Sequence, residues 1–313
     1  MRVYFHTFGC KANQYDTERM RQEAEARGAA PVASWTEAEV CVVNTCTVTN
    51  QADAEARRFI RRMGRENPEL RVVVAGCSAA LRGSEYAAME RVCGVVAGHD
   101  PVAVARALGD APVQLELRTS LDRMHAEPIG GELLRRRAGA SRGWLKVQDG
   151  CDRKCSFCAT RLARGASRSR DPFEVVREAR VLARTHPELV VTGIHIGHYG
   201  RDLDPPWTLS RLVALLLEEV PEARFRLGSV EATEVDEELV DLLCSSGGAL
   251  APHLHMPLQS GSDAVLKGMR RWHTREQYRR RTWDIVERVG EMGLGADIIA
   301  GFPGEEEGHH AET

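Results

Sequence analysis

Apolar and polar positions alternate along the first third of the chain in a pattern that predicts strands and helices in turn. Short apolar runs at residues 2–7, 39–44 and 71–75 predict strands. The last run, Arg-Val-Val-Val-Ala, is typical of a strand that is buried on both faces. Polar stretches at residues 14–27 and 52–63 separate these runs and predict helices. Because strand and helix alternate, we expect a parallel sheet in an α/β domain.

A second series of strand and helix patterns occupies the rest of the chain. It predicts five strands, at residues 144–148, 188–192, 224–230, 253–257 and 296–300. Helical patterns lie between them, at residues 172–185, 208–219, 234–246, 262–269 and 275–293. Five strand–helix units of this kind predict an open, partial (β/α) barrel with function at the carboxyl ends of its strands. We therefore expect an α/β chain with an N-terminal parallel-sheet domain over residues 1–112, a linker over 113–141 and a barrel domain over 142–313.

The composition fits two domains of ordinary size. The chain has 313 residues, 43% of them hydrophobic, and no apolar run approaches the ~18 residues that a membrane helix needs. The start lacks a signal-peptide pattern, and nine cysteines without a disulfide-dense layout favour a reducing cytoplasm and metal ligation. The net charge of −3 does not indicate a nucleic-acid binder by itself. Lys and Arg nevertheless gather between residues 132 and 170, which suits a polyanionic substrate such as RNA.

Cys151, Cys155 and Cys158 lie within one run of eight residues, Cys-Asp-Arg-Lys-Cys-Ser-Phe-Cys, directly after a predicted strand. Three thiolates can hold one metal centre, and a tetrahedral zinc or a 4Fe-4S cluster normally takes four ligands. Because no fourth cysteine follows at close spacing, one coordination position is left for another group, as a catalytic metal requires. The alternatives are a structural zinc with a distant fourth ligand and a chance grouping of cysteines.

Cys10, Cys46 and Cys77 each follow shortly after one of the three N-terminal strands. Open α/β sheets bind ligands at the carboxyl ends of their strands, so these thiols can meet at one edge. The repeated position predicts a second metal site, and the alternative is three ordinary small core residues. The remaining cysteines sit in apolar stretches and are interpreted as buried packing thiols, namely Cys41, Cys93 and Cys244.

The C-x3-C-x2-C spacing, with Phe157 before the last cysteine, resembles the signature of the radical S-adenosylmethionine enzymes. The resemblance implies that these three cysteines hold a 4Fe-4S cluster. It further implies that the amino and carboxylate groups of S-adenosylmethionine complete the fourth iron. One electron from such a cluster cleaves the sulfonium and yields a 5′-deoxyadenosyl radical, so the cofactor carries the difficult chemistry.

With both cysteine sets placed, residues 1 to about 307 resemble the methylthiotransferase family of these enzymes. The resemblance rests on Thr-Phe-Gly-Cys-Lys-Ala-Asn-Gln-Tyr-Asp at 7–16, Asn-Thr-Cys-Thr-Val-Thr at 44–49, Ala-Gly-Cys at 75–77 and Ala-Arg-Gly-Ala-Ser-Arg-Ser-Arg at 163–170. It implies an auxiliary 4Fe-4S cluster on Cys10, Cys46 and Cys77 that is implicated in sulfur delivery. The radical would then abstract hydrogen from carbon 2 of an adenine, to which the methylthio group is transferred.

The family has three main branches, which modify isopentenyl-adenosine in tRNA, an aspartate of a ribosomal protein, or threonylcarbamoyl-adenosine beside the anticodon. Gly-Cys-Lys-Ala-Asn-Gln-Tyr-Asp at residues 9–16 resembles the third branch. That resemblance implies methylthio transfer to carbon 2 of N6-threonylcarbamoyladenosine at tRNA position 37. It implies a tRNA anticodon loop and an electron donor such as flavodoxin or ferredoxin as partners. The alternatives are the other two branches and a non-catalytic metal-binding module.

Weaker matches at the ends of the barrel strands imply contacts to S-adenosylmethionine. The matching residues are Thr192, Gly193, Glu231, His255, Gln259, Gly301, Phe302 and Pro303. Each has a plain alternative, since a Thr-Gly pair often forms a turn, an isolated glutamate is often a solvated charge at a helix start, and a strand histidine is often a core residue. His195 and His198 are interpreted as loop residues near the barrel mouth rather than as metal ligands. The sequence singles out no catalytic acid or base.

The match departs from the family after Gly-Phe-Pro-Gly-Glu at residues 301–305. The family continues with a helix, a sixth barrel strand and a small RNA-binding β domain, whereas this sequence stops at Thr313. We therefore expect a barrel without its last strand, an exposed edge on the fifth strand and weakened affinity for RNA. An inactive, truncated relative is accordingly a further alternative.

Overall fold

A computed structural model describes residues 1–109 and 133–313, which divide into two compact units. The described part of the first, the N-terminal unit, comprises residues 1–109, 134–138 and 159–166. The described part of the second, the barrel unit, comprises residues 133, 139–158 and 167–313. The predicted linker at 113–141 lies outside the described residues over most of its length. The membership of residues 159–166 in the N-terminal unit was not expected from the sequence.

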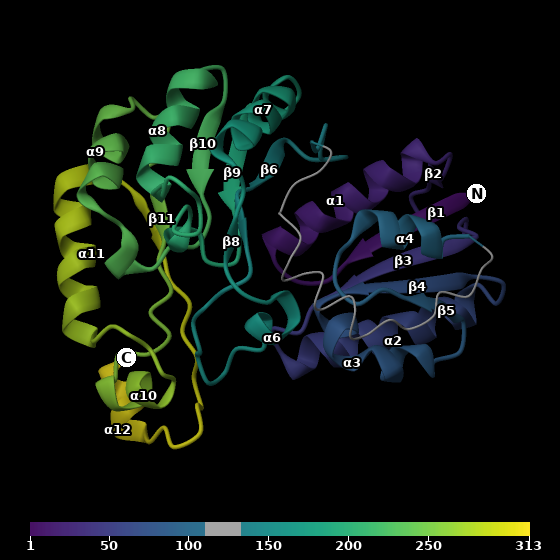
Figure 1. Cartoon of the computed structure of the whole chain (residues 1–313). Helices are drawn as coiled ribbons and strands as arrows, with labels where there is room; N and C mark the ends of the chain where they lie inside the picture. Colours follow the sequence, from purple (N-terminus) through teal and green to yellow (C-terminus); the bar gives the residue numbers. More distant parts are fainter. Residues whose placement is uncertain (110–132) are drawn as a thin grey trace. The chain divides into compact units, whose positions relative to one another are not determined.

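The N-terminal unit is built on a five-stranded parallel sheet, which confirms the predicted α/β fold class (Figure 1). In the spatial order β2-β1-β3-β4-β5, its strands are Ala30–Pro31, Arg2–Thr7, Val40–Thr45, Arg71–Gly76 and Val92–Val95. Every adjacent pair is parallel, so the strands all end at the same edge. The three strands predicted in this region are thus confirmed, with small shifts at their ends.

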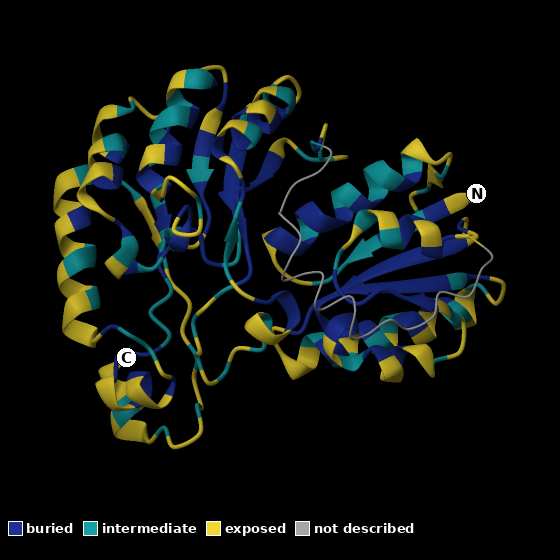
Figure 2. Ribbon diagram, in the orientation of Figure 1, coloured by how far each residue is buried: buried dark blue, intermediate teal, exposed yellow. Residues whose placement is uncertain are grey.

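Helices cover both faces of this sheet, which explains why its central strands are apolar on both sides. They are α1 (Lys11–Ala26), α2 (Asn50–Glu66), α3 (Cys77–Ala87) and α4 (Pro101–Ala107). The short α6 (Thr160–Arg164) packs beside α3, where Ala163 shares a small cluster with Cys77 and Ala80. On one face, Val40 and Val42 share an apolar cluster with residues of α1 and α4. On the other face, Val43 and Val74 share a cluster with residues of α2 and α3. Figure 2 shows the resulting band of buried strands between helices with exposed outer faces.

The barrel unit contains an open row of five parallel strands. They are β6 (Arg142–Lys146), β9 (Glu188–Thr192), β10 (Arg224–Leu227), β11 (His253–His255) and β12 (Gly293–Gly295). The first three form one sheet in the order β10-β9-β6, and β11 pairs with β12. Single parallel bridges from Phe225 to Leu250 and from Ser229 to His255 join the two groups. A small antiparallel pair, β7 (Gln148–Asp149) with β8 (Arg168–Ser169), follows β6.

Helices alternate with these strands along the chain, as predicted. They are α7 (Pro172–Ala183), α8 (Leu209–Glu219), α9 (Glu237–Ser245), α10 (Asp263–Gly268), α11 (Arg275–Val289) and α12 (Glu307–Glu312). Two short 3-10 turns, η1 (Ile196–His198) and η2 (Ala232–Glu234), lie in the loops after β9 and β10. Over the part of the chain that the structure describes, every helix is too short or too polar to cross a membrane.

The fifth barrel strand lies earlier in the chain than predicted. We expected it at residues 296–300, but regular pairing with β11 covers only Gly293–Gly295. The partner strand cannot continue regularly, because Pro257 has no N–H to donate and Gln259 adopts a left-handed φ of 69°. Pairing resumes only at a single bridge between Gln259 and Ile298.

The strand predicted at residues 224–230 is also shorter than expected and ends at Leu227. The backbone then changes partner, since Gly228 N still donates to the β9 carbonyl of Val191, whereas Val230 N donates to the β11 carbonyl of His255. At the far side, β12 pairs with β11 alone among the described residues.

Candidate metal centres and cofactor site

The N-terminal unit gathers three thiols at the carboxyl edge of its sheet. Cys10 caps the start of α1 after β1, Cys46 follows β3 directly, and Cys77 begins α3 after β4. All three are free thiols, and the charges of Cys10 and Cys46 both act on Cys77. The structure thus brings together the three cysteines that the sequence placed at strand ends, and three neighbouring sulfur donors fit a 4Fe-4S cluster.

Two glycines make this convergence possible. Gly9, directly before Cys10, has a φ of 97°, and a Cβ there would lie 2.5 Å from Cys46 Sγ. Gly76, directly before Cys77, also has a φ of 97°, and a Cβ there would clash with the side chain of Asn44. A side chain at either position would be strained and would collide with the neighbouring loop. Glycine is therefore required on steric grounds directly before Cys10 and before Cys77.

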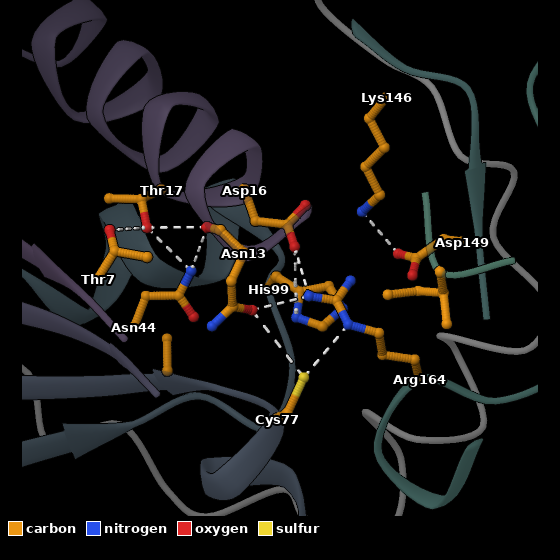
Figure 3. Close-up of polar contacts among 12 residues, drawn as sticks. Thr7, Asn13, Asp16, Thr17, Asn44, Cys77, His99, Lys146, Asp149 and Arg164 are labelled. Carbon is orange, nitrogen blue, oxygen red and sulfur yellow. Dashed lines mark hydrogen bonds and ion pairs between the residues drawn. The ribbon is translucent and has the colours of Figure 1, made fainter. Parts of the chain in front are cut away.

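A buried polar network supports these loops (Figure 3). Asn13 Nδ2 donates to the carbonyls of Phe8 (2.8 Å) and Thr45 (2.9 Å), which lie just before Cys10 and Cys46. Asn44 Nδ2 in turn donates to the Asn13 carbonyl at 2.8 Å. Because each bond joins different segments, the network fixes the loops that carry the thiols.

The side chain of Arg164 joins the same network from α6 and is fully buried (0% exposed). Its Nε donates to Cys77 Sγ at 3.2 Å, and its Nη2 donates to Asn13 Oδ1 at 2.7 Å and to Asp16 Oδ2 at 2.8 Å. A buried guanidinium needs a carboxylate partner, and Asp16 supplies it.

Burial is the strongest influence on the pKa of two thiols of this site, Cys46 and Cys77. It raises the pKa of Cys77 to about 11, against the opposing effect of the Arg164 charge. Burial likewise raises the pKa of Cys46. These two thiols are therefore protonated at neutral pH without metal, and metal binding must release protons.

The barrel unit gathers a second set of thiols in the loop after β7. Cys151 and Cys155 are half-buried, Cys158 is exposed, and Cys158 N donates to the Cys155 carbonyl at 3.2 Å. Burial raises the pKa of Cys155, the neighbouring charges of Cys158 and Cys151 add to this, and Arg271 opposes it. The Arg271 guanidinium contacts Cys155 Sγ at 3.6 Å. These three free thiols also lie close together and fit a second 4Fe-4S cluster.

Behind Cys151 lies a buried charge network that the sequence did not reveal. The carboxylate of Glu234, 5% exposed, accepts from His195 Nε2 at 2.7 Å and from Arg153 Nη2 at 3.0 Å, and its Oε1 lies 3.0 Å from His198 Nε2. His195 Nδ1 lies 3.5 Å from Cys151 Sγ. Burial acts to lower the pKa of His195, but its bonds to Cys151 and Glu234 outweigh burial and raise that pKa to about 9.

His195 and His198 are in the loop after β9, as predicted, and both are buried. With Glu234 they offer three ligand atoms within 4.8 Å of one another. The guanidinium of Arg153 occupies the same place, 3.1 Å from His198 Nε2, and its positive charge disfavours a cation there. In the structure the arrangement is an ion-pair network, and the prediction that these histidines are not metal ligands stays a prediction.

Trp272 adds an aromatic layer to this network. Two guanidinium groups lie over its ring system, that of Arg153 at 3.9 Å and that of Arg271 at 4.1 Å from ring centroids. Arg271 also pairs with Glu231. One arginine therefore contacts the Glu234 network, and the other contacts both Cys155 and Glu231.

Gln148 ties the cysteine loop to the loop after β9. Its Nε2 donates to the Gly150 carbonyl at 2.7 Å, and its Oε1 accepts from His195 N at 2.8 Å. Gly193 permits this approach, because a Cβ there would lie 2.8 Å from the Gln148 carbonyl. Beside it, Lys146 and Asp149 form a buried ion pair at 2.7 Å (Figure 3).

The predicted cofactor contacts follow the carboxyl ends of four successive parallel strands. Thr192 ends β9 and Gly193 follows it, and Glu231 follows β10. His255 ends β11 and Gln259 follows it, and Gly301, Phe302 and Pro303 come after β12. Parallel pairing directs these strand ends to one side of the sheet. The structure therefore places Thr192, Gly193, Glu231 and His255 at strand ends on one side, whereas Gly301, Phe302 and Pro303 lie six or more residues beyond the end of β12.

Their individual surroundings differ. Thr192 is buried, and His255 Nδ1 lies 2.9 Å from Ser229 Oγ, so the histidine has a local partner. Glu231 is held by Arg271. Gly301 has a φ of 75°, and a Cβ there would meet no atom within 4 Å, so its surroundings are open.

The interpretation of the three remaining cysteines is only partly correct. Cys41 is buried in the sheet, but Cys93 and Cys244 are exposed. Cys93 lies on the edge strand β5, and Cys244 lies in the last turn of α9. Apolar neighbours in sequence did not reveal which side of each element faces solvent.

Comparison with known proteins agrees with both units. Residues 2–98 match the uncharacterized protein family UPF0004, and residues 145–313 match the Radical SAM superfamily. The threonylcarbamoyladenosine tRNA methylthiotransferase MtaB of Bacillus subtilis is 36% identical over 99% of this chain and 69% of its own length. MtaB of Aquifex aeolicus is 34% identical over all of this chain and 76% of its own length.

A solved structure also resembles the fold. The cobalamin-dependent S-adenosylmethionine radical enzyme OxsB with bound aqua-cobalamin gives a TM-score of 0.62 over 99% of this chain, at 12% sequence identity. The chain spans about half of that structure, 51% of its length. At this identity the likeness concerns the fold alone.

The open row of parallel strands and the cysteine loop define a radical S-adenosylmethionine enzyme, a class that uses S-adenosylmethionine with a 4Fe-4S cluster. Within this class the chain belongs to the methylthiotransferase family, whose enzymes transfer methylthio groups.

Proposed function

We propose that this protein is a tRNA methylthiotransferase that adds a methylthio group to carbon 2 of N6-threonylcarbamoyladenosine at tRNA position 37. The observation that carries the proposal is the pair of free-thiol triplets, one at the strand ends of each unit. Relatives named threonylcarbamoyladenosine tRNA methylthiotransferase, at 32–36% identity, support the substrate. The Lys-Ala-Asn-Gln-Tyr-Asp run after Cys10 supports the same branch.

In this proposal each triplet holds one 4Fe-4S cluster. Cys151, Cys155 and Cys158 hold the radical cluster, and Cys10, Cys46 and Cys77 hold an auxiliary cluster that takes part in sulfur delivery. When bound, the radical cluster and S-adenosylmethionine supply a 5′-deoxyadenosyl radical. The remaining roles belong to the chain's own residues.

Residues around the radical loop position its thiols. Arg271 donates to Cys155 Sγ, and His195 lies against Cys151 Sγ while Glu234 holds the other side of its ring. Gln148 fixes the loop to the end of β9 through bonds on both sides. These fixed contacts preorganise the sulfur ligands before the cofactor binds.

The strand-end residues are proposed to hold S-adenosylmethionine. Thr192 and Gly193 would meet its amino group, Glu231 its ribose, and the segment from Gly301 to Pro303 its adenine. The open surroundings and left-handed backbone of Gly301 support close approach of a ring. His255 and Gln259 complete the same edge.

The proposal requires partners of defined chemistry. Reductive cleavage needs an electron, so a low-potential donor such as flavodoxin or ferredoxin is part of it. The substrate is the anticodon loop of a tRNA, and the site of action is the cytoplasm. Exposed basic residues near the cysteine loop in sequence, such as Lys154 and Arg161, would attract such a polyanion. Lys146, Arg164 and Arg170 are instead buried and paired with carboxylates.

The test is an anaerobic assay with reconstituted protein, S-adenosylmethionine, reductant and tRNA. Cys155→Ala is expected to abolish cofactor cleavage, because the radical cluster loses a ligand. Cys46→Ala is expected to spare cleavage and to stop methylthio transfer. Methylthio transfer by the Cys46 variant would show that the auxiliary-cluster assignment is wrong.

The isopentenyl branch is the second candidate, because a specific finding favours it. The tRNA-2-methylthio-N(6)-dimethylallyladenosine synthase of Parafrankia sp. is 33% identical over 98% of this chain. The two candidates separate when tRNA carrying either modified adenosine is offered and the nucleosides are analysed by mass spectrometry. Product from the threonylcarbamoyl tRNA alone supports the proposal, and product from the dimethylallyl tRNA alone contradicts it.

A further inference from the structure

Arg164 occupies an unusual place along the chain. It ends α6 (Thr160–Arg164), a helix that begins two residues after Cys158, yet α6 belongs to the N-terminal unit. There it is one of the largest fully buried side chains in the described residues. A segment adjoining the radical loop in sequence therefore delivers a permanent positive charge to the unit that holds the other three cysteines.

The contacts of this arginine exceed what charge pairing alone requires. Asp16 Oδ2 accepts from Nη2 at 2.8 Å and satisfies the buried charge. The Nε–H is instead directed at Cys77 Sγ, 3.2 Å away. A neutral thiol is a weak acceptor, whereas an anionic sulfur forms a charge-assisted bond with a guanidinium, so the geometry suits the metal-bound form of Cys77.

The same guanidinium reaches the other two cysteine segments through one amide. Nη2 donates to Asn13 Oδ1 at 2.7 Å, and Asn13 Nδ2 binds the carbonyls of Phe8 and Thr45. Those carbonyls lie next to the Gly9-Cys10 pair and next to Cys46. Arg164 therefore braces all three loops, one directly and two through Asn13. Figure 3 shows its bonds to Cys77 and Asn13.

We propose that Arg164 is a positioning residue for the auxiliary cluster, and that its hydrogen bond to Cys77 Sγ raises the reduction potential of that cluster. The inference rests on the proposed function, which assigns the cluster to Cys10, Cys46 and Cys77. Hydrogen bonds to cluster sulfurs, together with local charge, are established determinants of such potentials. The inference also gives the segment after the radical loop a role, since Arg164 fastens it to the N-terminal unit.

Arg170 supplies a matched control. It is 2% exposed, lies in the barrel unit and pairs with Glu178 at 2.9 Å. Arg170→Lys therefore disturbs a buried arginine–carboxylate pair of the same kind. A general effect of altering a buried arginine appears in both variants, whereas a specific effect on the auxiliary cluster appears only at Arg164.

The experiment uses the full chain with Cys151, Cys155 and Cys158 replaced by Ala, so that only the auxiliary cluster remains. Arg164→Met and Arg164→Lys are added to this background and reconstituted without oxygen. Iron and sulfide analysis and a potentiometric titration followed by electron paramagnetic resonance are the readouts. We expect the midpoint potential to move to more negative values in Arg164→Met, less so in Arg164→Lys, and not at all in Arg170→Lys.

The outcomes separate this inference from the proposed function. A background protein that holds no iron overturns both, because there is then no auxiliary cluster. A cluster whose potential and spectrum are unchanged in both Arg164 variants overturns only the role of Arg164. Circular dichroism checks the fold, and if Arg164→Met unfolds, Arg164→Lys decides the question. A shift of the same size in Arg170→Lys also overturns the inference.

Discussion

Replacement of Glu234 by Gln tests the buried network behind the radical loop. The amide keeps the shape of the carboxylate but removes its charge. One accepting oxygen becomes an NH2 group, which donates hydrogen bonds and therefore cannot bind the donors that face it. Three side chains lose their anionic partner, namely His195, His198 and Arg153. Since Glu234 is 5% exposed, water replaces these partners poorly.

The expected cost follows from the bonds. Hydrogen bonds to charged groups contribute about 1.5–3 kcal/mol each, but relief of the carboxylate's desolvation offsets part of this, and Arg153 is 30% exposed, so solvent screens its share. A net loss of about 2–3 kcal/mol in the free energy of unfolding is therefore expected. For a unit of this size, that corresponds to a Tm lowered by about 5–10 °C.

The assay is thermal unfolding of the metal-free protein, followed by tryptophan fluorescence. Four of the five tryptophans report on the barrel unit, namely Trp144, Trp207, Trp272 and Trp283. Glu219→Gln is the matched control, because Glu219 pairs with Arg180 on an exposed surface, 39% and 51% exposed. An exposed pair contributes about 0–1 kcal/mol, so this control is expected to change little.

The pH dependence gives a second check on the same variant. The bonds to His195, His198 and Arg153 oppose burial and hold the pKa of Glu234 well below its usual 4.5, so its contribution is present above pH 4.5 and is lost in acid. The pKa of His195 is raised from 6.5 to about 9, so its contribution is complete below pH 6.5 and is lost as pH rises through 9. The difference between wild type and variant is thus largest between pH 4.5 and 6.5. Equal shifts in Glu234→Gln and Glu219→Gln would refute the reasoning.

Three further predictions concern other parts of the chain. Gly9→Ala should lower the iron content per reconstituted chain by about half, because Gly9 has a φ of 97° and a Cβ there would lie 2.5 Å from Cys46 Sγ. An unchanged iron content contradicts the steric argument. Glu188→Gln should lower the free energy of unfolding by about 1 kcal/mol at pH 7, as measured in urea, because the bond of Glu188 to Arg226 holds the pKa of Glu188 below 4.5. This difference between the two proteins should vanish in acid, and a difference that does not depend on pH rejects the prediction. Phe225→Ala, fully buried in β10, should cost about 3–5 kcal/mol in the same assay, and a cost below about 1 kcal/mol is incompatible with that packing.

Local sequence pattern was enough to predict the sheet of the N-terminal unit and the placement of its thiols. The apolar runs of β3 and β4 mark strands that are buried on both faces, whereas β1 buries only Val3 and Phe5. The residue after each of these parallel strands must lie at the shared edge. Cys10, Cys46 and Cys77 could therefore be grouped without knowledge of any contact.

The supporting residues could not be predicted, because their partners are remote in sequence. Arg164 and Asn13 are 151 positions apart, and Arg153 and Glu234 are 81 apart. From sequence alone, an isolated charged residue is expected to be exposed to solvent. The burial of Glu234 and Arg164 can therefore be recognised only once the fold is known. The displaced fifth strand has the same origin, since its position is set by pairing with β11 rather than by its own composition.

The central claim is that two sets of three thiolates each hold an iron–sulfur cube and that only one of them binds S-adenosylmethionine. Its most direct test is Mössbauer and electron paramagnetic resonance spectroscopy of oxygen-free protein, before and after addition of S-adenosylmethionine. Wild type is compared with two variants, each with one cysteine set replaced by Ala. The account predicts that each variant keeps one cluster and that the nucleotide alters the spectrum only where Cys151, Cys155 and Cys158 are intact. Zinc in place of iron, or spectra indifferent to S-adenosylmethionine in the wild type, would contradict it.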